Sequence, residues 1–174
     1  VSGELFDIKA EDAKQVIINS PVLSQQKLRQ LMSPDFYGDH HAFIDLNYHE
    51  SNDLVSALKR MCSEAEEAVR AKKAFILLSD RYIKSNMIPA HALLATGAIH
   101  HHLVRLGLRS KTNIIVETGV ARDSHHFACL IGYGATAVYP YLVYQSLHDL
   151  ARKGSVDRSQ QLGRSFRRGI RKGL

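Results

Sequence analysis

Cysteine is scarce in this chain, which has only Cys62 and Cys129 in 174 residues. Both lie in apolar stretches with helical spacing, where a free cysteine usually behaves as a small buried hydrophobic residue. They form no Cys-x-x-Cys pair, and structural zinc sites and iron–sulfur clusters need more ligands than two isolated thiols supply. We therefore expect no metal or cluster built from this chain, and reduced thiols favour a cytoplasmic location.

Long apolar runs and a leader sequence are also missing. No run approaches the roughly 18–20 apolar residues that cross a bilayer, so we expect no membrane contact. Val1 to Glu4 lack the basic and apolar regions of a signal peptide. Because the sequence does not begin with methionine, we expect a processed or excised piece of a longer protein.

Several familiar site motifs are absent as well. The sequence has no phosphate-binding Gly-x-x-x-x-Gly-Lys-Ser/Thr, no dinucleotide-binding Gly-x-Gly-x-x-Gly between a strand and a helix, and no Gly-x-Ser-x-Gly. The glycines at 132 and 134 follow a helical pattern and precede a strand pattern, which predicts a helix stop. In the triplet of residues 100–102, three histidines project about 100° apart on a helix and cannot face one metal ion. We expect one of them to be buried and two to lie at the surface or an interface.

The formal net charge is +6 and the isoelectric point is near 9.4. A basic protein can bind nucleic acid or another anionic partner. Here the excess is local, because five cations fall within the last eleven residues: Arg164, Arg167, Arg168, Arg171 and Lys172. Phe166 is the one aromatic residue among them and no known reader motif is present, so we expect no nucleic-acid binding.

Apolar residues make up 45% of the chain and recur in blocks that predict alternating strands and helices. Short apolar runs that suit buried strands cover residues 42–46, 75–78, 113–116 and 135–139. Helical patterns cover residues 24–32, 52–69, 89–104, 125–131, 140–153 and the tail from 159. We expect Ser24, and either Ser51 or Asn52, to cap the first two helices, and Pro89 to open the third.

This alternation predicts an α/β fold with mostly parallel βα units. Four such units fit either half of a (β/α) barrel or a small doubly wound sheet, and the pattern alone leaves both open. We expect one domain overall, with a connecting arm at 1–41, a βα core at 42–158 and an amphipathic helix at 159–174.

Polar residues cluster just after two of the predicted strands, at the end of a parallel sheet where ligands usually bind. They are Ser79, Asp80, Arg81, Glu117, Arg122, His125 and His126. Two interpretations stay open. These side chains could form a binding or catalytic site, or Asp80 and Asp123 could cap helices while the arginines pair with carboxylates.

Long collinear segments of this sequence resemble the glutamate synthase large subunit. They include ILLSDR at 76–81, GAIHHHLVR at 97–105, IIVET at 114–118, ARDSHHFA at 121–128 and RGIRKGL at 168–174. The resemblance covers most of the chain from about residue 44 and is to the central domain of that subunit. Tyr139 before Pro140 favours the bacterial NADPH-type enzymes.

The resemblance implies an incomplete, barrel-like domain inside a large enzyme. That enzyme converts L-glutamine, 2-oxoglutarate and a reductant to two molecules of L-glutamate. Its amidotransferase domain releases ammonia, and a barrel domain that carries FMN and a 3Fe-4S cluster uses this ammonia. The large subunit of the parent enzyme associates with a small subunit. No catalytic, cofactor-binding or metal-binding residue carries over, because the nucleophilic cysteine and the cluster cysteines are missing and the FMN domain would follow Leu174.

Three functions are therefore in competition. The first is a connector that holds the amidotransferase and FMN domains in register and helps to wall the ammonia path, with the seven strand-end residues as candidate interdomain contacts. The second is a stand-alone enzyme that uses Asp80, Arg81, Glu117, His125 and His126. The third is a nucleic-acid-binding module that uses the basic tail. The resemblance favours the first, and we expect the isolated chain to be inactive.

Overall fold

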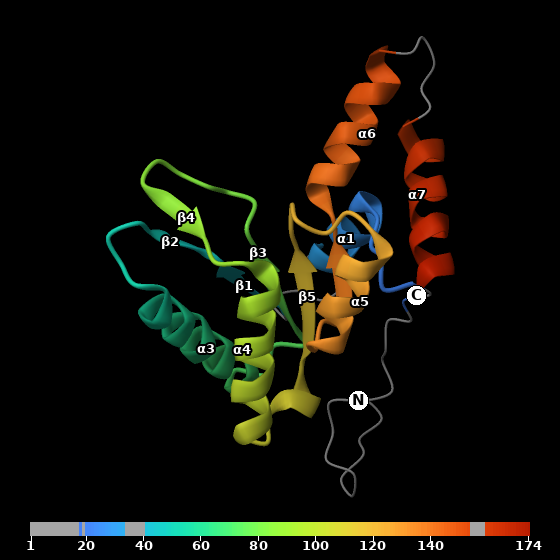
Figure 1. The fold of residues 1–174 in the computed structure, drawn as a ribbon. Coiled ribbons are helices and arrows are strands. Elements are labelled where there is room, and N and C mark those ends of the chain that lie inside the picture. Colours follow the sequence, from blue (N-terminus) through green and yellow to red (C-terminus); the bar gives the residue numbers. More distant parts are fainter. Residues whose placement is uncertain (1–17, 19, 34–40, 154–158) are drawn as a thin grey trace, which may run out of the picture.

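The computed structural model describes residues 18, 20–33, 41–153 and 159–174 (Figure 1). Its strands are β1 His41–Asp45, β2 Asn47–His49, β3 Phe75–Ser79, β4 Met87–Pro89, β5 Asn113–Glu117 and β6 Ala137–Tyr139. Its helices are α1 Gln25–Met32, α3 Leu54–Arg70, α4 Ala92–Arg105, the 3-10 turn η2 Arg109–Lys111, α5 Ser124–Gly132, α6 Tyr141–Lys153 and α7 Ser159–Gly173.

Four parallel strands form the main sheet in the order β1-β3-β5-β6. All five residues of β3 are buried, which explains why its sequence is a continuous apolar run without alternation. The register places Ser79 beside Glu117, and Glu117 beside Tyr139, so the polar ends of three strands meet at one edge. The four strands predicted from the sequence are confirmed, although β6 begins at Ala137 rather than at residue 135.

The strand order distinguishes between the two architectures that the sequence allowed. The strands lie side by side in chain order, whereas a doubly wound sheet reverses its order at a switch point. Helices α3, α4 and α5 all pack in one apolar cluster on one face, and α1 and α6 contribute to the cluster on the other face. This arrangement is that of an incomplete α/β barrel, with the crossover helices outside.

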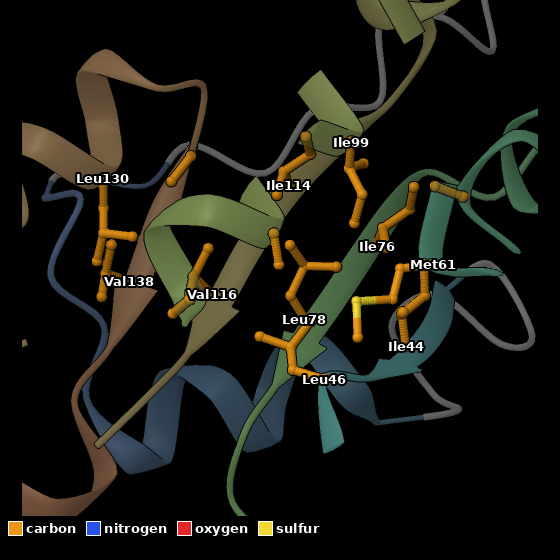
Figure 2. Packing of buried hydrophobic residues seen from close by; sticks show 14 of the residues in the cluster. Ile44, Leu46, Met61, Ile76, Leu78, Ile99, Ile114, Val116, Leu130 and Val138 are labelled. Carbon is orange, nitrogen blue, oxygen red and sulfur yellow. The ribbon is translucent and has the colours of Figure 1, made fainter. Parts of the chain in front are cut away.

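The larger apolar cluster lies between the sheet and helices α3, α4 and α5 (Figure 2). Ile44, Ile76 and Leu78 project from β1 and β3 toward Met61 of α3, and each is at most 1% exposed. Full burial of one such side chain stabilises the fold by about 1.5–3 kcal/mol. Leu130 of α5 extends the cluster to the β6 end of the sheet.

Side chains at the helix starts explain where the helices begin. The Ser24 hydroxyl accepts from the Lys27 N–H, as predicted for α1. Helix α3 is capped by Asp53, whose carboxylate accepts from the Ser56 N–H, so the predicted caps Ser51 and Asn52 are wrong. Aspartate is preferred here because its carboxylate also complements the positive end of the helix dipole.

The prediction that Pro89 opens a helix is also wrong. Pro89 ends β4, which pairs antiparallel with β2 in a small second sheet, and α4 begins three residues later after His91. Both strands are three residues long, too short for a clear alternation of apolar and polar residues. At the end of α5, Gly134 has φ +111°, which confirms the predicted helix stop.

The C-terminal helix packs on its own domain. Phe166 of α7 lies 6.2 Å from the Phe127 ring and 6.1 Å from the Tyr144 ring, and Ile170 is 6% exposed. Near the other end of the described chain, Val22 forms a parallel bridge with Val138 and so covers the outer edge of β6. The predicted division into arm, core and tail stays a prediction, since residues 1–17, 34–40 and 154–158 lie outside the described part.

Candidate functional site

The carboxyl edge of the sheet carries a buried carboxylate, Glu117, at the end of β5. Its side chain is 4% exposed, and its two oxygens accept from different neighbours. The Ser79 hydroxyl donates to Oε2 at 2.7 Å, and Arg81 Nη1 donates to Oε1 at 3.0 Å. Burial acts to lower the pKa of Arg81, but the hydrogen bond and charge of Glu117 outweigh it and raise that pKa. The predicted pairing of an arginine with a strand-end carboxylate is confirmed here.

Asp80 is the second buried carboxylate of this edge and is 6% exposed. It accepts a hydrogen bond from the Thr118 hydroxyl and another from the Gly119 N–H at 3.0 Å. The prediction that Asp80 caps a helix is therefore wrong, because it fastens the turn after β5 to the turn after β3. Burial and the nearby Asp80 charge raise the pKa of Tyr141 to about 12.

The side chain of Arg81 also lies against two aromatic rings. Its guanidinium carbon is 5.6 Å from the centre of the Tyr82 ring and 5.3 Å from that of Tyr141. Cation–π contacts of this kind favour a fixed, charged arginine. Together with Glu117, they hold Arg81 within its own domain.

Arg122, His125 and His126 lie apart from this network. Asp123 caps α5, because its carboxylate accepts from the His126 N–H at 3.1 Å, as predicted. The same carboxylate lies 3.0 Å from Nδ1 of His126, while Nε2 of His125 lies 3.6 Å from the Cys129 sulfur. The side chain of Arg122 is exposed and makes no hydrogen bond or ion pair with any residue that the structure describes, so the predicted pairing of Arg122 with a carboxylate is not found there.

The structure thus divides the seven predicted residues into two groups. Ser79, Asp80, Arg81 and Glu117 bond to one another or to the adjoining turn. Arg122 and His125 are instead exposed at the start of α5, and His126 is half-buried there. Each buried carboxylate of the first group accepts one hydrogen bond on each of its two oxygens, so these side chains tie the turns after β3 and β5 together.

The histidine triplet is divided among different partners. His100 accepts from Arg109 Nε at 3.0 Å, His102 Nε2 lies 3.1 Å from Glu66, and His101 is exposed. His100 and His102 are both half-buried, so the expected single buried histidine is not seen. Within the described ranges, no three His, Cys, Asp or Glu side chains are grouped so that they could hold a metal ion.

The sequence reasoning missed an apolar groove of about 770 Å³ between α3 and α4, on the side away from the sheet. Each helix contributes a stripe with spacing i, i+3, i+4, i+7, i+8 and i+11. The α3 stripe is Val55, Leu58, Lys59, Cys62, Ser63 and Glu66. The α4 stripe is Leu94, Gly97, Ala98, His101, His102 and Arg105. Tyr133 closes one end, with its ring packed over Gly97. The available signal was the apolar spacing on the outward face of each helix, but the groove itself exists only where α3 and α4 lie side by side.

A family model described as "Glutamate synthase central domain" matches residues 1–174. The chain belongs to the glutamate synthase central domain family. It is 36% identical, over 97% of its length, to the glutamate synthase [NADPH] large chain of Bacillus subtilis. It is 36% identical over 89% of its length to glutamate synthase [NADH] of Schizosaccharomyces pombe, and 34% identical over 99% to ferredoxin-dependent glutamate synthase of Spinacia oleracea.

This central domain spans 11%, 8% and 12% of those three relatives, respectively. The NADPH-type relative agrees with the expected type, and relatives named for NADH and for ferredoxin are almost as similar. In the described ranges of the central domain, no helix is both long and apolar enough to cross a membrane.

The tail of the central domain forms a second hollow, of about 500 Å³, beside the segment before α1. Ser20 lines it together with the basic residues Arg164, Arg167, Arg168, Arg171 and Lys172. Arg167 Nη1 donates to the Tyr144 hydroxyl at 3.4 Å, which fastens part of the basic face to α6.

Proposed function

We propose that this domain is a non-catalytic connector in the large chain of a glutamate synthase. It holds the amidotransferase and FMN domains in register and forms part of the wall of the ammonia path. The parent reaction converts L-glutamine and 2-oxoglutarate, with a reductant of NADPH type, to two L-glutamate. A small subunit joins the assembly through other parts of the large chain, and the enzyme works in the cytoplasm.

The observation that carries the proposal is the buried hydrogen-bond network at the carboxyl edge of the sheet. In a parallel α/β enzyme, the side chains at this edge usually carry the chemistry. Here Asp80 and Glu117 each accept two hydrogen bonds from their own domain. Such a network suits a rigid block that keeps two distant sites at a fixed separation.

Side chains around the network are suited to contact with neighbouring domains. Tyr82 and Ile83 follow the network after β3 and are 58% and 54% exposed, while Val120 and Leu142 are 39% and 48% exposed. Arg122 adds a charge without a partner in the described part of the chain. In this proposal, the candidate interdomain contacts are Arg122, His125, His126 and these apolar side chains.

In this proposal, the cofactors of the parent glutamate synthase bind to another domain. A 3Fe-4S cluster needs three thiolates, and the chain has two cysteines, one on α3 and one on α5. The cysteines therefore do not fit a cluster, and we assign FMN and the cluster to the neighbouring barrel domain.

The test is Arg122→Ala in the full-length large chain. Loss of an exposed contact worth about 0.5–1 kcal/mol should lower the yield of glutamate per glutamine hydrolysed by roughly two- to fivefold. Glutamine hydrolysis and ammonia-dependent synthesis, assayed separately, should keep their rates. Lys111→Ala, which removes an exposed cation in the 3-10 turn before β5, is the matched control and should leave the coupling unchanged.

Loss of ammonia-dependent synthesis in this variant would instead identify Arg122 as a catalytic residue. If Arg122→Ala abolished ammonia-dependent synthesis in an enzyme that is folded and FMN-loaded, the connector proposal would be wrong.

A further inference from the structure

The α3–α4 groove is unusual because it leaves apolar side chains exposed in an otherwise well-packed layer. Val55 and Leu94, on opposite walls, are 61% and 46% exposed, and Tyr133 at the end is 52% exposed. Its lining also includes the small residues Ser63 and Ala98. Small residues in the lining allow another segment to approach the two helices closely.

The length and shape of the groove fit a third helix. Each stripe extends over twelve residues of helix, from i to i+11, or roughly 16 Å, which is the length of about three helical turns. Two neighbouring helices present a furrow into which the ridge of a third helix packs. An amphipathic helix with apolar side chains at every third or fourth position would cover both walls at once.

The charged side chains that line the groove further restrict the kind of helix that could dock there. Lys59 and Arg105 lie on the two walls and make no ion pair with other described residues. Glu66 is the one carboxylate of the lining, and it is held by Arg70 at 2.8 Å and by His102 at 3.1 Å. A helix that lies here therefore meets unpaired positive charge and should carry acidic residues on its flanks.

We propose that the α3–α4 groove is a docking site for an acidic amphipathic helix from another part of the same large-chain polypeptide. The inference rests on the proposed connector function. The central domain spans 8–12% of its relatives, so most of the polypeptide lies outside it and is held at high effective concentration. A helix of the same chain thus needs only a modest apolar contact in order to dock.

Cys62 is a natural reporter for this contact, because it lies in the groove and is half-buried in the isolated domain. In the native full-length chain, its alkylation by iodoacetamide, quantified by peptide mass spectrometry, should be at least about tenfold slower than in the isolated domain. Leu94→Asp in the full-length chain should undo most of this protection, because it places a charge in the contact. Val104→Asp is the matched control, since Val104 is 50% exposed on the same helix but outside the groove.

A second experiment identifies the occupant and works on the unmodified protein. Carbodiimide treatment of the native full-length chain should join Lys59 by an amide bond to an aspartate or glutamate of another domain. A cross-linked peptide with helical apolar spacing from the same molecule supports the inference. A peptide from a second copy, shown by mixing isotope-labelled and unlabelled protein, or from a different protein overturns it.

Equal alkylation of Cys62 in the full-length chain and the isolated domain would also overturn the inference. The two proposals can fail separately. A shielded Cys62 with unchanged coupling in Arg122→Ala would contradict the connector function alone. An open Cys62 with lost coupling in that variant would contradict the groove inference alone.

Discussion

The carboxyl edge of the sheet and the α3–α4 groove lie in one small domain, yet they differ in whether their side chains find partners within it. At the edge, the polar groups of Asp80 and Glu117 are buried and paired, and little is left for a neighbour. Along the groove, apolar groups such as Val55 and Leu94 are exposed and lack cover. The network at the edge stabilises the fold of the domain. The exposed apolar groove can instead gain free energy when another segment covers it.

We expect the largest effect from a variant that removes the buried hydrogen-bond network at the carboxyl edge of the sheet. Glu117→Ala leaves the half-buried Arg81 without its counter-ion and Ser79 without its acceptor, so it should lower the free energy of unfolding by about 3–5 kcal/mol. Urea denaturation of the two proteins measures the difference. Glu64→Ala removes a carboxylate from an exposed i,i+4 pair with Arg60, and we expect it to cost less than about 0.5 kcal/mol. Equal costs for the two variants would show that the buried network does not stabilise the edge.

A subtler change tests the second half of the same network. Thr118→Val keeps the shape of the side chain but removes the hydroxyl that donates to Asp80, which should cost about 1–3 kcal/mol. Ser146→Ala, which removes an exposed hydroxyl on α6, is the control and should be close to neutral. If Thr118→Val were as mild as its control, solvent would be satisfying Asp80 and the edge would be less closed than described.

Alkaline pH probes the edge through Tyr141. Burial and Asp80 raise its pKa from 10.0 to about 12, so the folded state holds the phenolic proton more tightly than the unfolded state does. Its contribution to stability is thus complete below pH 10 and is lost as the pH rises from 10 toward 12. Tyr141→Phe should weaken the pH dependence of urea unfolding between pH 9 and 12. Tyr133→Phe, on an exposed ring at the groove, should leave that dependence as it is in the parent sequence.

The smallest effect is expected in the groove. In the isolated domain, Leu94→Asp should change the free energy of unfolding by no more than about 0.5 kcal/mol, because the side chain is already largely in solvent. Leu103→Ala, at a fully buried position on the same helix, should cost about 2–5 kcal/mol. If Leu94→Asp were as costly as Leu103→Ala in the isolated domain, the groove would be part of the core and not an open surface.

Much of the fold could be predicted because buried parallel strands have a plain sequence pattern. Residues 75–79 are apolar or small throughout, and the helices between the strands have clear apolar spacing. The β2–β4 sheet could not be found in this way, since strands of three residues are too short to show a period. The cap of α3 was missed by one residue, because Ser51, Asn52 and Asp53 are all favourable capping residues and only the backbone conformation decides among them.

The candidate site was predicted in part. Strand-end position alone brought Ser79, Asp80, Arg81 and Glu117 together, because parallel strands in register end at one edge. Their partners depended on the turn geometry, which placed the hydroxyl of Thr118 and the N–H of Gly119 at Asp80. The groove was missed for a different reason. Its residues look like ordinary helix surface until two helices are set side by side.

The bridge between Val22 and Val138 has a consequence for the order in which the domain assembles. Leu23, which is 1% exposed, donates its N–H to the Val138 carbonyl, and the Tyr144 hydroxyl donates to the Leu23 carbonyl across 121 residues of sequence. A nascent chain leaves the ribosome from its N-terminus, so residues 20–33 emerge well before the strand that receives them. Contacts so distant in sequence form slowly. We therefore expect residues 20–33 to reach their final position only after β6 has been made, and the cluster around Phe75 and Leu77 to be completed at that stage.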